Sequence, residues 1–517
     1  MSQATTETPA KPSDSLRKRY AAKLSANVLG APLTLATQSL ATRLVGVDGY
    51  GTFSLLTNFF QGLTGLLDAG VSTCFYTKLS QRPTDLGLKL VITRLFLGLT
   101  LVATAFCLVA FATGWSKWIW LGKHAGDVWL ALAYSLALWG SQLIGLMIDA
   151  HGLTVWGEKL RLLQRVFALT LLAGMFWRHW NSLGAFFGAN ISAVLFVAAG
   201  WWWVMRREGF PVWPVGQLDI EARRECAREF WRYSQPLVVY AAVGFVAGYG
   251  ERWLLERFGG TTQQGFYGLA LQTSAVCFLF ISAMTPLFTR EFAIAHGRDD
   301  QKRMTMLFER LAPAFYAVAA YFSLFVCLEA KEIALLAGGD KFRGAGPALA
   351  VMALYPIHQT YGQLNGSVFF ATGNTRRYRN IGVLTMITGL LFTAWVLAPR
   401  RVGGLELGST GLAYKMVLIQ FLSVNLQVWW NARLLGLSFR RILIRQVAVV
   451  VAFGTVAWLS RFIVARAVTS MWPAFFLSGF AYTLACGGLL VAWPRLVNVS
   501  REELTGRLRA GLNFARG

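Results

Sequence analysis

Long apolar runs are the feature that most constrains what this chain can fold into. They last about 20 residues each and recur from residue 24 to residue 494. A helix of that length crosses the ~30 Å hydrocarbon core of a bilayer, whereas barrel strands would give alternating segments of about 10 residues. Because backbone polar groups must be paired internally in lipid, the runs predict an all-α polytopic membrane protein. A content of 55% hydrophobic and 14% charged residues agrees with this prediction.

The distribution of basic residues predicts the number and orientation of the helices. We expect about 14 transmembrane helices, with both termini cytoplasmic. The tails and even-numbered junctions, with the helix ends next to them, hold 34 of the 49 Lys and Arg residues, and the opposite junctions with their helix ends hold 13, as the positive-inside rule requires. The predicted spans are residues 24–46, 50–76, 88–112, 127–149, 160–178, 183–205, 233–256, 265–289, 309–330, 345–371, 380–398, 409–432, 444–466 and 472–494.

The net charge of +24 has an explanation in the same topology. Cytosolic loops that face anionic lipid gain about 1 kcal/mol per cation. The basic residues are scattered over many short loops, with no compact soluble domain to present them, which argues against nucleic-acid binding. The six cysteines show neither pairing nor metal-ligand spacing, so we expect them to pack in the helices and expect no metal site.

An internal repeat divides the predicted helices. The pairs Tyr50-Gly51 and Tyr267-Gly268 are 217 positions apart, and the loop at 152–161 corresponds to the loop at 366–376 at nearly the same offset. Helices 1 to 6 and 7 to 12 are therefore predicted to be parallel repeats that form two lobes around a central cleft, with helices 13 and 14 as an appendix.

The repeat gives a predicted domain plan. It comprises a basic cytosolic tail (1–23), an N-terminal lobe (24–205), a cytosolic linker (206–232), a C-terminal lobe (233–435), helices 13 and 14 (436–494) and a second cytosolic tail (495–517). Residues 219–232 and the run from residue 500 to residue 512 are amphipathic and are expected to lie on the membrane surface.

Short motifs at matching places in the two repeats resemble a known family. The stretch Arg43-Leu-Val-Gly through Gly49-Tyr50-Gly51, followed by Leu-Leu-Asp-Ala-Gly at 66–70, is similar to the amino-terminal signature of Wzx-type polysaccharide flippases. These flippases belong to the multidrug/oligosaccharidyl-lipid/polysaccharide exporter superfamily. In the second half, Glu251-Arg252, Gly-Gly at 259–260 and Gly-Phe-Tyr-Gly at 265–268 resemble the family's acidic-Arg pair and Gly-x-Tyr turn, although Glu251 stands where Asp is more usual.

The resemblance implies a two-lobed, alternating-access flippase of the bacterial inner membrane. Its implied substrate is an undecaprenyl-diphosphate-linked oligosaccharide repeat unit, used for O-antigen (lipopolysaccharide), capsule or exopolysaccharide assembly. Glycosyltransferases on the inside and a glycan polymerase on the outside are the implied partners, together with membrane lipids. No enzymatic activity and no cofactor are implied.

Charged residues within the predicted spans are the first candidates for a substrate site, because charge at a helix centre costs at least ~2.5 to 3.5 kcal/mol. Arg94 in helix 3 and Lys415 in helix 12 either snorkel to an interface or line the cleft and attract the diphosphate. Arg43 and Arg252 lie near the outer ends of helices 1 and 7 and are further candidates, although Arg43 falls off the polar stripe of its helix.

Uncharged polar residues and acids supply the remaining candidates. Asn58 and Gln61 share one face of helix 2 with Asp68, a face that lines the cleft or contacts another helix. His358, in the middle of helix 10, is a candidate for proton coupling, with a neutral packing histidine as the alternative. Glu251 and Asp68 are further coupling candidates.

Other functions are weighed against flipping. No Gly-x-x-x-x-Gly-Lys-Ser/Thr loop occurs, which argues against direct use of ATP. An ion-coupled drug or metabolite antiporter and a peptidoglycan-precursor flippase are alternatives within the superfamily. A membrane glycan polymerase is the alternative from another class, and the short outer junctions argue against it.

Overall fold

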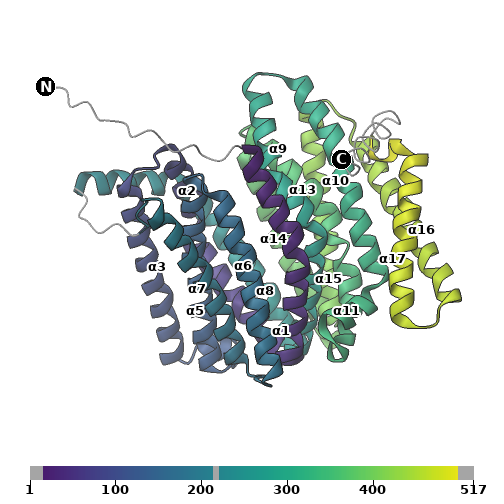
Figure 1. The fold of residues 1–517 in the computed structure, drawn as a ribbon, viewed down its shortest axis with the longest axis horizontal. Helices are drawn as coiled ribbons and strands as arrows, with labels where there is room; N and C mark the ends of the chain where they lie inside the picture. Colours follow the sequence, from purple (N-terminus) through teal and green to yellow (C-terminus); the bar gives the residue numbers. More distant parts are fainter. Residues whose placement is uncertain (1–15, 213–219, 499–517) are drawn as a thin grey trace. The chain divides into compact units, whose positions relative to one another are not determined.

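The computed structural model describes residues 16–212 and 220–498, and throughout these ranges the chain is helical without a strand (Figure 1). The α-helices are α1 (Leu16–Asp68), α2 (Val71–Gln81), α3 (Leu86–Ala112), α4 (Ser116–Ile119), α5 (Ala125–Ala150), α6 (Thr154–Trp177), α7 (Leu183–Arg207), α8 (Ile220–Ala275), α9 (Leu279–Gly297), α10 (Gln301–Leu328), α11 (Ala330–Gly338), α12 (Gly346–Met352), α13 (Tyr355–Ala371), α14 (Thr375–Leu397), α15 (Gly408–Leu435), α16 (Phe439–Ala467) and α17 (Met471–Ala492). Four short 3-10 helices join them, namely η1 (Val276–Phe278), η2 (Asp340–Ala345), η3 (Arg400–Val402) and η4 (Pro494–Val497).

The apolar runs form membrane helices as predicted. Nine helices of the described ranges are long and apolar enough to cross a bilayer: α3, α5, α6, α7, α10, α14, α15, α16 and α17. The all-α membrane fold is thereby confirmed, whereas the number of 14 crossings stays a prediction. The run from residue 500 to residue 512 lies outside the described residues, as does the first residue of the amphipathic linker at 219–232.

Glycine interrupts the two longest helices, α1 and α8. Gly46 has φ 68° and ψ −175°, and Gly260 has φ 77° and ψ 177°. This backbone region is accessible essentially to glycine alone, so each glycine turns one helix sharply into the next. Helix α1 therefore contains the predicted helix 24–46 and residues 50–68 of the predicted helix 50–76, whose end lies in α2. Helix α8 contains 233–256 and the beginning of 265–289.

By its internal contacts the chain forms two compact units, and each takes residues from separate parts of the sequence. Unit 1 comprises Met1–Thr37 and Leu56–Phe245, and unit 2 comprises Gln38–Leu55 and Val246–Gly517. In unit 1, α5 packs against α7 and α2, around buried side chains that include Phe75, Met147 and Met205. In unit 2, α10 packs against α13 and α16 around Phe308 and Tyr316. The predicted lobe boundaries at 24–205 and 233–435 stay a prediction.

The turns of the two repeats pack against each other within unit 2, and each turn makes the same backbone contact with the other. Gly51 lies so close to the carbonyl oxygen of Thr261 that a Cβ would collide with it, and Gly265 lies equally close to the carbonyl oxygen of Val47. Val47 and Thr261 are 214 positions apart, as are Gly51 and Gly265. The two contacts are therefore related by a local pseudo-two-fold axis.

A hydrogen bond between the two turns joins equivalent positions of the repeats and gives the same offset of 214 residues. Thr262 Oγ1 donates to Asp48 Oδ1 at 2.7 Å, and these two positions are also 214 apart. The loop glycines Gly152 and Gly366 share the same offset. The sequence alignment that placed Tyr50 opposite Tyr267 is therefore shifted by three residues, because it matched aromatic residues rather than the backbone turn.

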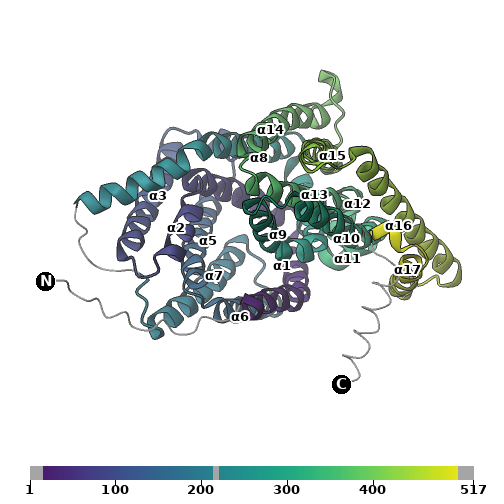
Figure 2. The same cartoon turned by 90° about the horizontal axis from the view of Figure 1, so that it is seen from above.

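Helices α16 and α17 pack against one another and, through α16, against α10 (Figure 2). An ionic cluster fastens them to the end of α10. Arg461 of α16 donates to Glu329 Oε2 at 3.1 Å and to Glu332 Oε1 at 3.0 Å, and Ser478 of α17 donates to Glu329 Oε1 at 2.7 Å. These charge-assisted hydrogen bonds hold the last two helices in addition to apolar packing.

Candidate functional site

A buried ion pair joins two of the predicted site residues in unit 2. Lys415 of α15 donates to Glu251 of α8, and the side chains are only 5% and 13% exposed. Gly389 of α14 makes room for the lysine, since a Cβ there would lie 3.0 Å from Lys415 Cε. A charge pair this deep is stable only because each partner compensates the other.

Arg252 lies beside this pair and is buried to 6% exposure. Its guanidinium carbon stands 4.3 Å from the centre of the Tyr267 ring, a cation–π contact between the two segments of α8. Within the described residues its Nη1 atom has no hydrogen-bond partner. A buried guanidinium nitrogen that lacks an acceptor is suited to bind an anion, because it regains a charge-assisted hydrogen bond without further desolvation.

His358 of α13 lies among aromatic side chains of the same unit. Its ring centre is 4.9 Å from that of Phe421 and 5.8 Å from that of Tyr316. In the part of the chain that the structure describes, its Nδ1 atom has no hydrogen-bond partner. The next residue, Gln359, accepts a hydrogen bond from Gln420 of α15. These surroundings suit a packing histidine, and a role in proton coupling stays a prediction.

Arg43 has a structural task that the sequence did not suggest. Its side chain is exposed and donates from Nη2 to the Leu336 carbonyl oxygen at 3.3 Å. Thr42 donates to the Ala337 carbonyl oxygen at 2.7 Å, and Ser39 donates to the Leu336 carbonyl oxygen at 2.9 Å. Together these side chains satisfy free carbonyl groups at the end of α11, where the helix dipole favours a cation.

The remaining candidates belong to unit 1. Asp68 accepts from Ser72 N at 3.1 Å and from Trp139 Nε1 at 3.3 Å, so its carboxylate caps α2 and contacts α5. Asn58 is half-buried with an unpaired Oδ1 atom among the described residues, whereas Gln61 and Arg94 are exposed. The structure therefore groups Lys415, Glu251 and Arg252 in unit 2, whereas Asp68, Asn58, Gln61 and Arg94 belong to unit 1.

Sequence reasoning missed some polar residues of unit 2. Asn431 of α15 donates to Asn365 Oδ1 at 3.0 Å, with both side chains at most 1% exposed. Gln420 and Gln359 form a second amide pair between α15 and α13. Four amide side chains follow Lys415 along α15, and this polar pattern could have predicted buried polar contacts on that helix. The space that Gly389 leaves for Lys415 has no corresponding pattern in the sequence.

Comparison with known proteins identifies the fold and the family. A family described as polysaccharide biosynthesis protein matches residues 16–290. The solved structure of the lipid II flippase MurJ in an inward closed conformation is 9% identical, with 92% of this chain and 99% of that one covered and a TM-score of 0.67. An inward-facing multidrug resistance MATE family transporter of the MOP superfamily is 14% identical, with 81% of this chain and 98% of that one covered and a TM-score of 0.62.

Among the curated proteins nothing matches the chain. The two structural similarities show the fold alone, and the match over residues 16–290 spans more than half of the chain. The titles of the two structural neighbours name a transporter and a flippase. The chain therefore belongs to the polysaccharide biosynthesis protein family.

Proposed function

We propose that this flippase translocates undecaprenyl-diphosphate-linked oligosaccharide repeat units across the bacterial inner membrane by alternating access. The translocated units would feed O-antigen, capsule or exopolysaccharide assembly. The observation that carries the proposal is the family match over residues 16–290. The grouping of Arg252 and Lys415 in unit 2 supports it, because a diphosphate that leaves water needs cationic partners.

The ion pair between Glu251 and Lys415 supports a coupled cycle. Removing one partner of a buried ion pair costs about 3 to 5 kcal/mol, since the other charge is left uncompensated. If a phosphate binds Lys415 in place of Glu251, the Glu251 carboxylate requires another cation, either a proton or a metal ion. Substrate binding at Lys415 and ion binding at Glu251 are therefore linked, which connects transport to an ion gradient without ATP.

The experiment uses a strain that lacks the chromosomal gene and carries the full chain on a plasmid. The variants Arg252→Ala, Lys415→Ala and Arg94→Ala are compared at equal membrane expression, with Lys117→Ala on the exposed helix α4 as the matched control. We expect the first two to reduce surface glycan and to accumulate lipid-linked oligosaccharide inside. Full export by all three variants would refute the proposed cationic site.

A second candidate function is ion-coupled export of a cationic drug or metabolite. The buried carboxylates of Glu251 and Glu256, the latter 7% exposed, favour it because a cationic substrate binds carboxylates. The same strain separates the two functions. Drug export predicts altered drug susceptibility with normal surface glycan, whereas glycan flipping predicts the reverse. A peptidoglycan-precursor flippase would instead be required for growth.

The topology is part of the proposal. Both termini are cytoplasmic, and the glycosyltransferases and the polymerase of the same pathway act on opposite faces of the membrane. A reporter that is active only in the cytoplasm, fused after residue 517, is expected to be active. An inactive fusion at normal expression would mean an odd number of crossings.

A further inference from the structure

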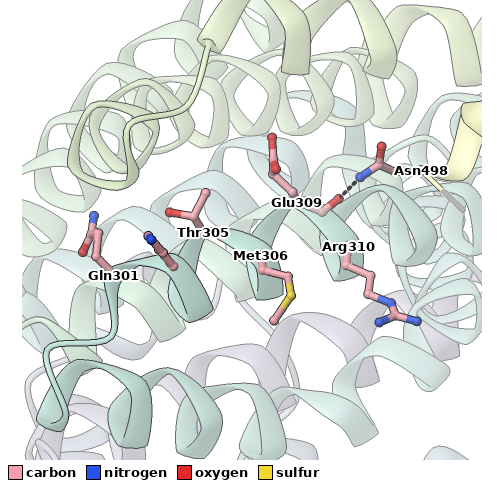
Figure 3. A pocket seen from close by; sticks show the side chains of 7 residues that line it. Gln301, Thr305, Met306, Glu309, Arg310 and Asn498 are labelled. Carbon is pink, nitrogen blue, oxygen red and sulfur yellow. Dashed lines mark hydrogen bonds between the residues drawn. The ribbon is translucent and has the colours of Figure 1, made fainter.

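A solvent-open cavity of about 470 Å³ lies on unit 2, lined by residues of the first turns of α10 and by Asn498 (Figure 3). Gln301 Nε2 donates to the Leu434 carbonyl oxygen at 2.6 Å, and Thr305 Oγ1 donates to the Leu435 carbonyl oxygen at 2.9 Å. Asn498 Nδ2 donates to the Glu309 carbonyl oxygen at 2.9 Å. The first turns of α10 are thus hydrogen-bonded both to the end of α15 and to the segment after η4.

A proline in α10 explains why the Asn498 side chain donates a hydrogen bond to the Glu309 carbonyl oxygen. Pro313 of α10 has no N–H group, so the carbonyl oxygen of Glu309, four residues earlier, lacks its helical donor. The Asn498 amide supplies that hydrogen bond from outside the helix (Figure 3). The cavity is therefore bounded by a specific interaction rather than by a chance crossing of loops.

The cavity lies at the level where membrane helices end. Three apolar helices begin or end beside it: α10 begins at Gln301, α15 ends at Leu435 and α16 begins at Phe439. Met306, which lines the cavity, is 57% exposed, and Ile444 on α16 is 58% exposed. Such apolar exposure next to helix ends is typical of the boundary between acyl chains and headgroups.

The surroundings of the cavity are basic. Lys302 and Arg310 line it, and Arg441 and Arg445 line the crevice beside it, with Glu309 common to both. Within the described residues, the side chains of Lys302, Arg441 and Arg445 have no hydrogen-bond or ion-pair partner. Of the residues that the structure describes, Glu309 is the one carboxylate that lines either space, so the balance of charge among them is positive.

We propose that this cavity and the crevice beside it bind the headgroup of an anionic phospholipid, with its phosphate at Arg441 and Arg445 of the crevice. Basic pockets between membrane helices on the cytoplasmic side suit such headgroups, and guanidinium groups match the geometry of phosphate oxygens. The lipid would bind across α10, α15 and α16 and so hold the ends of these helices together. This site is distinct from the pair of Lys415 and Glu251 and does not depend on what the protein flips.

The test measures lipid binding by the delipidated full-length protein in a neutral detergent, with native mass spectrometry to count bound phosphatidylglycerol or phosphatidylcholine. We expect a preference for phosphatidylglycerol. Each of Arg441→Gln and Arg445→Gln should weaken it about fivefold, at roughly 1 kcal/mol per cation. The control pair Arg400→Gln and Arg401→Gln, on η3, should leave it unchanged.

The variant Glu309→Gln should change phosphatidylglycerol affinity in the opposite direction to the arginine variants. It removes the carboxylate that faces the phosphate but keeps the backbone carbonyl that Asn498 holds, so it should strengthen phosphatidylglycerol binding. Equal binding of the two lipids, or equal losses in the arginine variants and the control pair, would overturn the proposal. Competition by inorganic phosphate as effective as that by the lipid would also overturn it, since the ligand would then be a free anion.

Discussion

At the residue scale, the ion pair between Lys415 and Glu251 is the most consequential contact, because the two side chains are only 5% and 13% exposed. Lys415→Met or Glu251→Gln alone leaves the partner uncompensated and should lower the free energy of unfolding by about 3 to 5 kcal/mol. The double variant should recover most of that loss. Thermal unfolding in one detergent tests this, and additive single effects would show that the two residues do not interact.

A second residue-scale prediction concerns an ionic cluster outside the membrane spans. Lys78 donates to Glu229 at 2.5 Å and Arg82 donates to it at 2.9 Å, and the hydrogen bond from Lys78 is the main reason why the pKa of Glu229 is lowered from 4.5. Since the folded-state pKa is the lower one, the cluster stabilises the fold above about pH 4.5 and loses its effect as the pH falls through the folded value.

Glu229→Gln should therefore destabilise the protein at pH 7 and have a smaller effect at the lowest pH at which the protein stays folded. The side chains are 29% to 30% exposed for Glu229 and Lys78, so the difference should stay below about 1 kcal/mol. Unfolding midpoints of the two proteins at both pH values measure it. A destabilisation that persists unchanged at low pH would contradict the assigned cause.

At the element scale, the turns at Gly46 and Gly260 depend on close backbone approach by Gly51 and Gly265. Gly51→Ala or Gly265→Ala forces a Cβ against a carbonyl oxygen and should cost about 1 to 3 kcal/mol. Gly174→Ala in α6, with no atom near its Cβ position, is the matched control and should stabilise by up to about 1 kcal/mol. Thermal unfolding that fails to separate these variants would argue against the close packing.

The proline of α10 gives another element-scale prediction. Asn498→Ala should destabilise by about 0.5 to 1.5 kcal/mol, since it removes the donor for the Glu309 carbonyl oxygen. In a Pro313→Ala background the helix regains its own N–H donor, so the same substitution should have almost no effect. Comparing unfolding in the two backgrounds measures this coupling, and an equal loss in both would mean that Asn498 acts through another contact.

At the scale of the whole molecule, the sequence predicted the fold class well because hydrophobic length and charge asymmetry are physical requirements of a bilayer. The motifs that carry the family resemblance include Gly46 and Gly260, the glycines that interrupt α1 and α8. The sequence could not predict that Lys415 is the partner of Glu251. The two residues are 164 positions apart in the sequence, and contact at that separation leaves no periodic pattern. Nor could it reveal the capping task of Arg43, which depends on where α11 ends.

The proposed function concerns the whole molecule, and transport by the purified protein tests it most directly. The protein is reconstituted in vesicles that carry a fluorescent undecaprenyl-diphosphate-linked oligosaccharide, and a membrane-impermeant glycosidase reports which leaflet holds it. We predict transfer by the wild-type protein and by Lys117→Ala, with transfer slowed about tenfold or more by Arg252→Ala and Lys415→Ala. No transfer by the wild-type protein, or wild-type rates in both variants, would contradict the account.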